Sequence, residues 1–204
     1  MENHYGLNEQ RFRTLMRIVA AANEDPDAEG IRWEATPHGI VMLSSPDWEH
    51  LDIVVALRNW LLERVPSTVM VGENNAFVVG GGFERTPDLF LVERKLRSEH
   101  RGGHALGIGG VQMFVEVTSR ATRNSDLGRT GDDDLYFPGK PRLYGDAGVP
   151  VYLIVDRKDH KIIVHSEPRP GGYRRTMIED VGEDVTLPDP VGLVLETEFL
   201  KDYL

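Results

Sequence analysis

The feature that most constrains the fold is a strand, a helix and a second strand in direct succession. The runs VQMFVEV (111–117) and VPVYLIVD (149–156) have the apolar and β-branched content of strands. Between them lies a short helical stretch, KPRLYGDAG, which ends at Gly148. Because a strand, a helix and a strand in this order imply a crossover unit, the chain is predicted to adopt an α/β fold.

Short β-rich runs make up most of the remaining chain after Ser67. Most are bounded by Gly, Pro, Asp or Asn, as strands usually are. These runs are STVMVG, AFVVG, DLFLV, KIIVHS, YRRTMI and VTLP. Together with the crossover unit they predict a mixed sheet flanked by helices.

Two helical stretches precede the β-rich part of the chain. Residues 8–22 repeat apolar side chains at helical spacing. A second helical stripe follows Ser45, predicted as the cap, with Pro46 at the first helical position. Two short runs between these helices, 31–35 and 39–44, predict a hairpin.

Length and composition describe an ordinary globular domain. The chain has 204 residues, of which 40% are apolar and 27% charged, and a chain of this size buries well over half of its unfolded surface. Zero cysteines exclude thiolate metal sites, so any metal must be held by oxygen or imidazole, which favours hard cations. The sequence begins without a basic and apolar leader and has no apolar run near the roughly 20 residues of a membrane span, so we expect a cytoplasmic protein.

The charge is acidic overall and uneven along the chain. The formal net charge of −10 opposes indiscriminate attraction to nucleic-acid phosphates. Basic residues nevertheless gather in VERKLRSEHRGGH and in RPGGYRR. Such charge runs are more often solvated loops and turns than binding sites, which is how we interpret them from the sequence.

Two carboxylates interrupt strand-like apolar runs. In RTPDLFLVER, Asp88 stands at the entrance of a run, and in QMFVEVTS, Glu116 stands between two valines. Alternation places Glu116 on the same strand face as Thr118. Carboxylates at the ends of neighbouring strands can share a hard divalent cation, which is typically bound through one or two carboxylates plus phosphate oxygens. The alternative is that Asp88 caps a turn and Glu116 pairs with an arginine on a half-exposed strand.

The order of the motifs is more specific than any one of them. RTPDLFLV contains a Pro-Asp strand, FVEVTS a Glu-x-x-Ser strand, and KPRLYGDAGVPVYLIVD a Lys-x-x-x-Tyr-x-x-x-Gly-Val helix that leads into a strand with a tyrosine. This order resembles the Uma family of restriction endonuclease-like proteins, a branch of the PD-(D/E)XK nuclease superfamily. The resemblance runs from about Trp33 to about Leu195. The residues that carry it are Pro87, Asp88, Glu116, Ser119, Lys140, Tyr144, Gly148, Val149, Tyr152 and Asp156, with His50 upstream.

The resemblance implies a restriction-endonuclease-like fold, with an N-terminal helix in 1–25 packed on a nuclease-like domain in 26–204. It also implies that Asp88 and Glu116 are catalytic metal ligands for Mg or Mn. The superfamily's usual lysine would stand two residues after the glutamate, where this chain has Thr118. In many Uma-like proteins the lysine comes from the following helix, which makes Lys140 the catalytic lysine here. It would offset charge on the attacked phosphate or orient the attacking water.

This chain departs from the family pattern just before the lysine. Tyr136 stands where the family often has an aspartate, and Pro141 predicts that Lys140 lies at the helix entrance. The acids at 132–134 could replace the missing aspartate or form a solvated loop. His50 could orient a phosphate or pair with an acid, although a lone histidine is more often structural. Glu73 is a candidate third acid near the metal.

The sequence therefore predicts a metal-dependent endonuclease that hydrolyses nucleic-acid phosphodiester bonds, with DNA as the expected substrate. A homodimer would supply the two sites that double-strand cleavage requires. The alternative from another class is a catalytically inactive nuclease-fold module that binds nucleic acid or a protein partner; Thr118, the altered segment before Lys140 and the charge of −10 favour it. A third alternative is a hydrolase of a smaller phosphoester.

Overall fold

The computed structural model describes residues 9–23, 32–36, 39–43, 46–95, 105–131 and 138–204. Its helices are α1 (Glu9–Asn23), α2 (Trp48–Arg64), α3 (Arg123–Asp126) and α4 (Lys140–Ala147), with 3₁₀ turns η2 (Gly80–Gly82) and η4 (Glu198–Tyr203). Its strands are β1 (Arg32–Thr36), β2 (Gly39–Leu43), β3 (Val69–Gly72), β4 (Ala76–Val78), β5 (Glu84–Arg85), β6 (Leu89–Glu93), β7 (Ala105–Leu106), β8 (Val111–Val117), β9 (Val151–Asp156), β10 (Lys161–Arg169), β11 (Gly172–Asp180), β12 (Asp184–Thr186) and β13 (Val194–Glu196).

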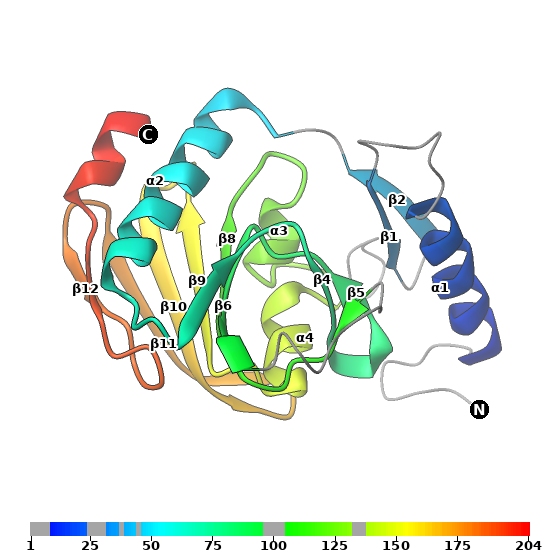
Figure 1. Cartoon of the computed structure of the whole chain (residues 1–204). Coiled ribbons are helices and arrows are strands. Elements are labelled where there is room, and N and C mark those ends of the chain that lie inside the picture. The colour runs from blue at the N-terminus through cyan, green and yellow to red at the C-terminus, as the bar shows by residue number, and fades with distance from the viewer. Residues whose placement is uncertain (1–8, 24–31, 37–38, 44–45, 96–104, 132–137) are drawn as a thin grey trace.

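A six-stranded mixed sheet forms the centre of the molecule, in the order β11-β10-β9-β8-β6-β3 (Figure 1). The pair β8 and β9 is parallel, whereas the other neighbours in this sheet are antiparallel. The parallel pair is joined through α4, so the predicted crossover unit is confirmed. Helix α4 begins at Lys140 and is capped by Gly148, whose φ of 84° is left-handed, so both predicted ends of this helix are also confirmed.

The sheet is buried on both faces because helices cover each of them. Alternate side chains of β8, Met113, Val115 and Val117, join one core cluster with the buried face of α2. Phe114 points the other way, into a second cluster that includes Leu143 of α4. The predicted alternation along β8 is therefore confirmed, and the strand is central rather than half-exposed.

The N-terminal elements form a separate layer beside the second core cluster. Strands β1 and β2 make the predicted antiparallel hairpin. Helix α1 buries Phe12 against Phe83, with ring centroids 4.6 Å apart. The cap of α2 differs from the prediction: its N-cap is Asp47, whose side chain accepts a hydrogen bond from the backbone N–H of His50 at 2.8 Å. Pro46 thus precedes the cap, and Ser45 lies outside the described residues.

The C-terminal part of the chain packs on α2 and carries most of the excess charge. Leu195 of β13 and Leu200 of η4 are buried in the cluster that α2 shares. Residues 179–204 contain eight acids and one lysine, so they account for −7 of the formal charge of −10. None of the described helices is long and apolar enough to cross a membrane.

Candidate active site

The sheet brings the two predicted acids side by side. Leu89 of β6 pairs with Val115 of β8 in an antiparallel register. Continuing this register by one residue places Asp88 opposite Glu116, and directly opposite residues share one face of an antiparallel pair. Asp88 lies just outside the start of β6, whereas Glu116 is inside β8 and only 3% exposed. Both carboxylates thus lie at one end of the sheet.

Lys140 reaches this pair from the start of α4. Its Nζ lies 2.8 Å from Glu116 Oε1 and 2.8 Å from Asp126 Oδ1. The side chains of all three residues are buried, with exposed fractions of 8% for Lys140, 4% for Glu116 and 0% for Asp126. The helix entrance predicted from Pro141 therefore directs the lysine into the site rather than away from it.

Asp126 is a member of this cluster that sequence reasoning missed. It ends the one-turn helix α3, and its Oδ2 accepts a hydrogen bond from Thr122 Oγ1 at 2.7 Å. The acids proposed for this role, 132–134, lie outside the described residues. Among the described acids, Asp126 and Glu116 are those that pair with Lys140. A polar residue in a short loop helix carries no sequence signal of its own.

Two tyrosines complete the buried cluster. Tyr144 of α4 donates its hydroxyl to Glu116 Oε1 at 2.8 Å, and Tyr152 of β9 donates to the backbone carbonyl of Asp126 at 3.1 Å. Their rings meet edge to face, with centroids 4.9 Å apart. Burial, together with the nearby charges of Glu116 and Asp126, raises the pKa of Tyr152 well above its usual value. Tyr144 thus orients the carboxylate of Glu116, and Tyr152 holds the backbone of Asp126.

The buried cluster contains more acid than base. Burial raises the pKa of Glu116 well above its usual value, and the charges of Asp88 and Asp126 add to this effect, although Lys140 opposes it. Burial likewise raises the pKa of Asp126 against the effect of Lys140. One ammonium thus faces three carboxylates at this end of the sheet. An additional cation would relieve their repulsion.

His50 anchors Asp88 from the first turn of α2. Its Nε2 lies 3.1 Å from Asp88 Oδ2, and the same oxygen accepts the backbone N–H of Val117 at 2.8 Å. Burial lowers the pKa of His50, but the hydrogen bond and the charge of Asp88 outweigh it, so the net pKa is raised. Asp88 Oδ1 accepts no hydrogen bond from any residue that the structure describes. The histidine therefore pairs with an acid, one of its two predicted roles, and leaves that oxygen available.

Asp88 and Glu116 can hold a hard divalent cation between two carboxylates. Within the described residues, no group of three or more His, Asp or Glu side chains is arranged to hold a metal ion. Two adjacent carboxylates, Asp88 and Glu116, remain, and a Mg²⁺ ion is commonly held by one or two carboxylates while waters and phosphate oxygens complete its shell. The residues present therefore fit such an ion, with waters or phosphate oxygens completing its shell.

Two other predicted residues do not join the cluster. Glu73 follows Val71 of β3, which faces the α2 side of the sheet, and its side chain lies 4.0 Å from Arg58 of α2. Thr118, at the position of the usual lysine, is buried. Its hydroxyl lies 3.4 Å from Asp156 Oδ1 and accepts the backbone N–H of Arg157 at 3.1 Å.

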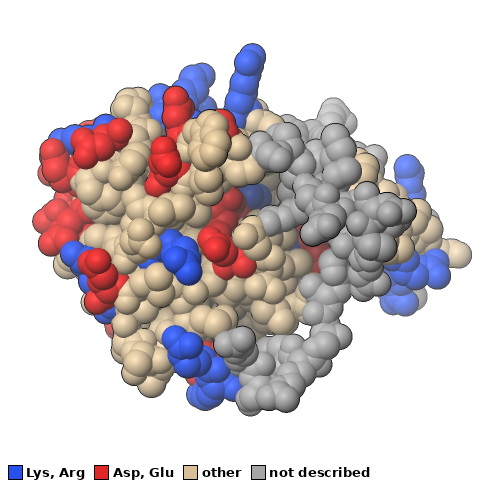
Figure 2. Space-filling view, turned by 45° about the horizontal axis from the view of Figure 1, so that its top comes forward, with Lys and Arg blue, Asp and Glu red and all other residues tan. Residues whose placement is uncertain are grey.

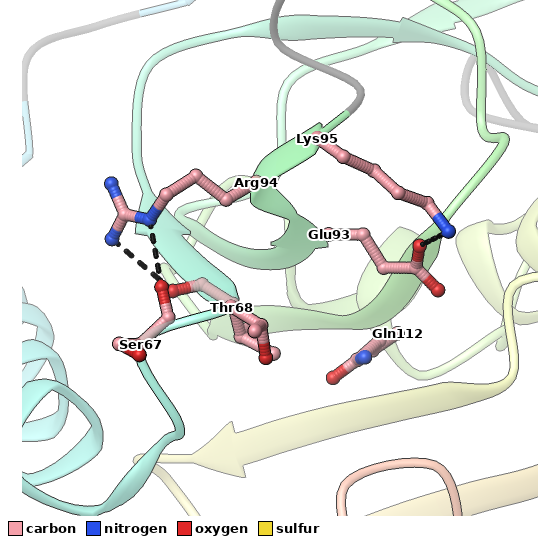
Figure 3. A pocket seen from close by; sticks show the side chains of 7 residues that line it. Ser67, Thr68, Glu93, Arg94, Lys95 and Gln112 are labelled. Atoms are coloured by element: carbon pink, nitrogen blue, oxygen red, sulfur yellow. Dashed lines mark hydrogen bonds and ion pairs between the residues drawn. The ribbon is translucent and has the colours of Figure 1, made fainter.

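A cavity of about 630 Å³ lies at the opposite end of β6 and β8 from the carboxylates. Figure 3 shows that its two basic side chains are already engaged. Arg94 donates to the backbone carbonyl of Ser67 at 3.0 Å, and Lys95 pairs with Glu93 at 2.6 Å. This cavity is therefore separate from the acid cluster.

Comparison with known proteins identifies the family and the fold of the chain. The sequence model of the Uma2 family, described as "Putative restriction endonuclease", matches residues 20–198. A solved structure of a putative nuclease from Anabaena variabilis ATCC 29413 superposes with a TM-score of 0.63 at 14% sequence identity, covering 84% of this chain and 90% of the other. At that identity the likeness concerns the fold. The chain matches no curated protein.

Proposed function

The chain belongs to the Uma2 family of putative restriction endonucleases, and on that premise we propose that it is a metal-dependent endonuclease that hydrolyses DNA. Family and fold are those of restriction endonuclease-like nucleases. The observation that carries the proposal is the buried contact of Lys140 with Glu116, 2.8 Å apart, beside Asp88. A lysine and two acids held at one strand end match the chemistry of phosphodiester hydrolysis.

Asp88 and Glu116 would hold Mg²⁺ or Mn²⁺. Bound there, the ion would polarise the phosphoryl group and lower the pKa of a bound water. Three features of the chain favour this assignment: the adjacent positions of the two acids, the uncommitted Oδ1 of Asp88, and the excess of carboxylates over ammonium groups. Burial is the main cause of the raised pKa of Glu116, and the ion would offset the repulsion from Asp88 and Asp126 that adds to it.

Lys140 would stabilise negative charge on the attacked phosphate. Its ammonium is held near the acids by Asp126, which in turn is held by Thr122. Tyr144 orients Glu116 and His50 orients Asp88. Each residue that would touch the ion or the phosphate is therefore held by a second side chain, which fixes the geometry before substrate arrives. A homodimer would supply two such sites for double-strand cleavage.

A plasmid cleavage assay at low salt tests the proposal. Supercoiled DNA is incubated with the wild type in Mg²⁺, in Mn²⁺ and in EDTA, beside Asp88→Ala, Glu116→Ala and Lys140→Ala. Lys201→Ala is the matched control, because Lys201 makes an exposed ion pair with Glu198. We expect metal-dependent cleavage by the wild type and the control, and its loss in the first two variants. Absence of cleavage by the folded wild type in either metal would refute the proposal.

The second candidate function is a nuclease-fold module that binds nucleic acid or protein without catalysis. One observation favours it: the ammonium of Lys140 and the hydroxyl of Tyr144 both contact Glu116 Oε1. A carboxylate satisfied in this way can persist without an ion. A wild type that binds DNA but neither cleaves it nor binds Mn²⁺ would favour this module over the enzyme.

A further inference from the structure

Three exposed cations lie near the end of the sheet that holds Asp88 and Glu116. They are Arg120, Arg129 and Lys158, and their side chains make no ion pair or hydrogen bond with any described residue. Several cations elsewhere in the described chain, such as Lys161 and Lys201, pair with nearby acids instead. Unpaired cations close to a buried acid cluster are available for an anionic partner.

The topology places these three cations together. Arg120 lies three residues past the end of β8, and Lys158 two residues past the end of β9. Because β8 and β9 are parallel, with Val117 opposite Val155, their C-terminal ends lie at the same end of the sheet. Arg129 follows α3, and its charge acts on Asp156 at the end of β9. The same edge holds Asp88 and Glu116.

Neighbouring ion pairs brace the loops that carry these cations. Arg123 donates from Nε and Nη2 to the two oxygens of Asp156, each at 2.7 Å. Arg157 contacts Asp47 at 3.0 Å and Glu49 at 2.7 Å, which ties the end of β9 to the start of α2. Arg123 and Arg157 thus hold the loops at this end of the sheet in place through their ion pairs. Arg120, Arg129 and Lys158 are exposed on the same loops.

The excess acid lies elsewhere on the molecule. Residues 179–204 hold −7 of the formal −10, so the other 178 residues carry only −3. Figure 2 shows acidic side chains gathered on the left, the side on which Figure 1 places β12 and the C-terminus. Beyond about a Debye length, near 8 Å at physiological salt, exposed acids are largely screened. At physiological salt the charge of residues 179–204 therefore adds little repulsion to a polyanion at the end of the sheet that holds Asp88 and Glu116.

We propose that Arg120, Arg129 and Lys158 form a basic rim that binds the phosphate backbone of the nucleic acid next to the scissile bond. The inference deepens the proposed function and rests on it for the position of that bond. Contacts of this kind fix register and orientation without reading sequence. Each phosphate neutralised on duplex DNA releases counterions and contributes about 0.9 to the slope of log affinity against log salt.

Fluorescence anisotropy with a labelled DNA duplex in EDTA measures this binding without cleavage. The test variant combines Arg120→Gln, Arg129→Gln and Lys158→Gln. The matched control combines Arg169→Gln, Arg174→Gln and Arg175→Gln. It removes the same charge from the β10–β11 hairpin, whose register places these arginines near the opposite end of β9. All six side chains are exposed, so both variants should fold, which circular dichroism verifies.

We expect the rim variant to bind at least about tenfold more weakly than the wild type at low salt, with a salt slope reduced by about 2 to 3. The control should stay within about twofold of the wild type. Equal losses in both variants, or none in the rim variant, would overturn the proposed rim. A wild type that binds through the rim but does not cleave in Mg²⁺ or Mn²⁺ would refute the proposed function alone. Cleavage that persists with unchanged KM in the rim variant would refute the rim alone.

Discussion

The buried acid cluster and the acidic C-terminal segment, residues 179–204, use the same charged groups in opposite ways. At the sheet edge, Glu116 and Asp126 are almost fully buried and share one ammonium, that of Lys140. In the segment, Glu198 and Lys201 form an ion pair in solvent, with exposed fractions of 73% and 52%. Burial makes each charge in the cluster depend on its neighbours, whereas solvent screens the charges of the segment.

This difference shows that the net charge does not describe the charge at any one part of the surface. Considered as a whole, the sequence has a charge of −10, which opposes indiscriminate attraction to nucleic-acid phosphates. Most of that charge belongs to the segment 179–204, which packs on α2 through Leu195 and Leu200. At the end of the sheet that holds the cluster, three exposed cations make no ion pair with any described residue. Where charges lie relative to the site matters more than their sum.

The largest contrast is expected in activity. Replacing Glu116 with Gln should lower the rate of DNA cleavage by about 10³-fold, since several kcal/mol of transition-state stabilisation would be lost with the ion. Glu196, exposed and paired with Arg64 at 3.2 Å, supplies the matched control. Single-turnover rates of Glu116→Gln and Glu196→Gln measure the difference. Similar rates for the two variants would remove the distinction between the regions.

The next contrast is in stability. Lys140→Met would leave Glu116 and Asp126 buried without their shared cation, which should cost about 3 to 5 kcal/mol in the free energy of unfolding. Lys201→Met removes an exposed pair and should cost less than about 1 kcal/mol. Urea denaturation of both variants at neutral pH gives the two values. A cost below that of Lys201→Met would show that the cluster is not held by its lysine.

A smaller effect is expected in the pH dependence of the unfolding free energy. The raised pKa of His50 means that its pairing with Asp88 stabilises the fold below the ordinary value of 6.5 and that this contribution disappears as pH rises through the raised value. The difference in unfolding free energy between wild type and His50→Gln should therefore be about 1 kcal/mol larger near pH 5.5 than near pH 8.5. Parallel denaturation curves at the two pH values test this. A difference that grows with pH would contradict the assigned pair.

The smallest effect is expected from the segment itself. Neutralising Glu179, Asp184 and Glu196 together as glutamine or asparagine should change duplex affinity by less than about threefold at physiological salt, because screening limits the reach of exposed charges. The anisotropy assay used for the basic rim measures it. An increase of tenfold or more would mean that the segment repels nucleic acid from the site.

The sequence was sufficient for those parts of the site that local pattern determines. Strand alternation placed Glu116 on the face of Thr118, and Pro141 placed Lys140 at a helix entrance. It could not identify Asp126, because a one-turn helix in a loop has no periodicity and its role depends on tertiary contact with Lys140. The predicted cap, Ser45, was wrong: Asp47, on the other side of the same proline, also belongs to a residue type that caps helices, and it is the N-cap in the structure.

The basic rim was also beyond sequence reasoning. Arg120, Arg129 and Lys158 are separated by 9 and 29 positions, whereas the sequence drew attention to local runs such as RPGGYRR. Only the parallel register of β8 and β9 brings the three cations to one edge. In RPGGYRR, Arg174 and Arg175 lie on an exposed part of β11. Their guanidinium groups lie 3.8 Å and 3.6 Å from the carboxylate of Glu167, which agrees with a solvated surface.

Calorimetric titration with Mn²⁺ tests most directly whether Asp88 and Glu116 form a metal centre. The wild type, Asp88→Asn, Glu116→Gln and the control Glu73→Gln are titrated at neutral pH; Glu73 pairs with Arg58 on the other face of the sheet. We predict that the wild type and the control bind Mn²⁺ and that both site variants lose this binding while remaining folded. Binding that is absent from the wild type, or equal in all four proteins, would contradict the metal centre and with it the proposed nuclease.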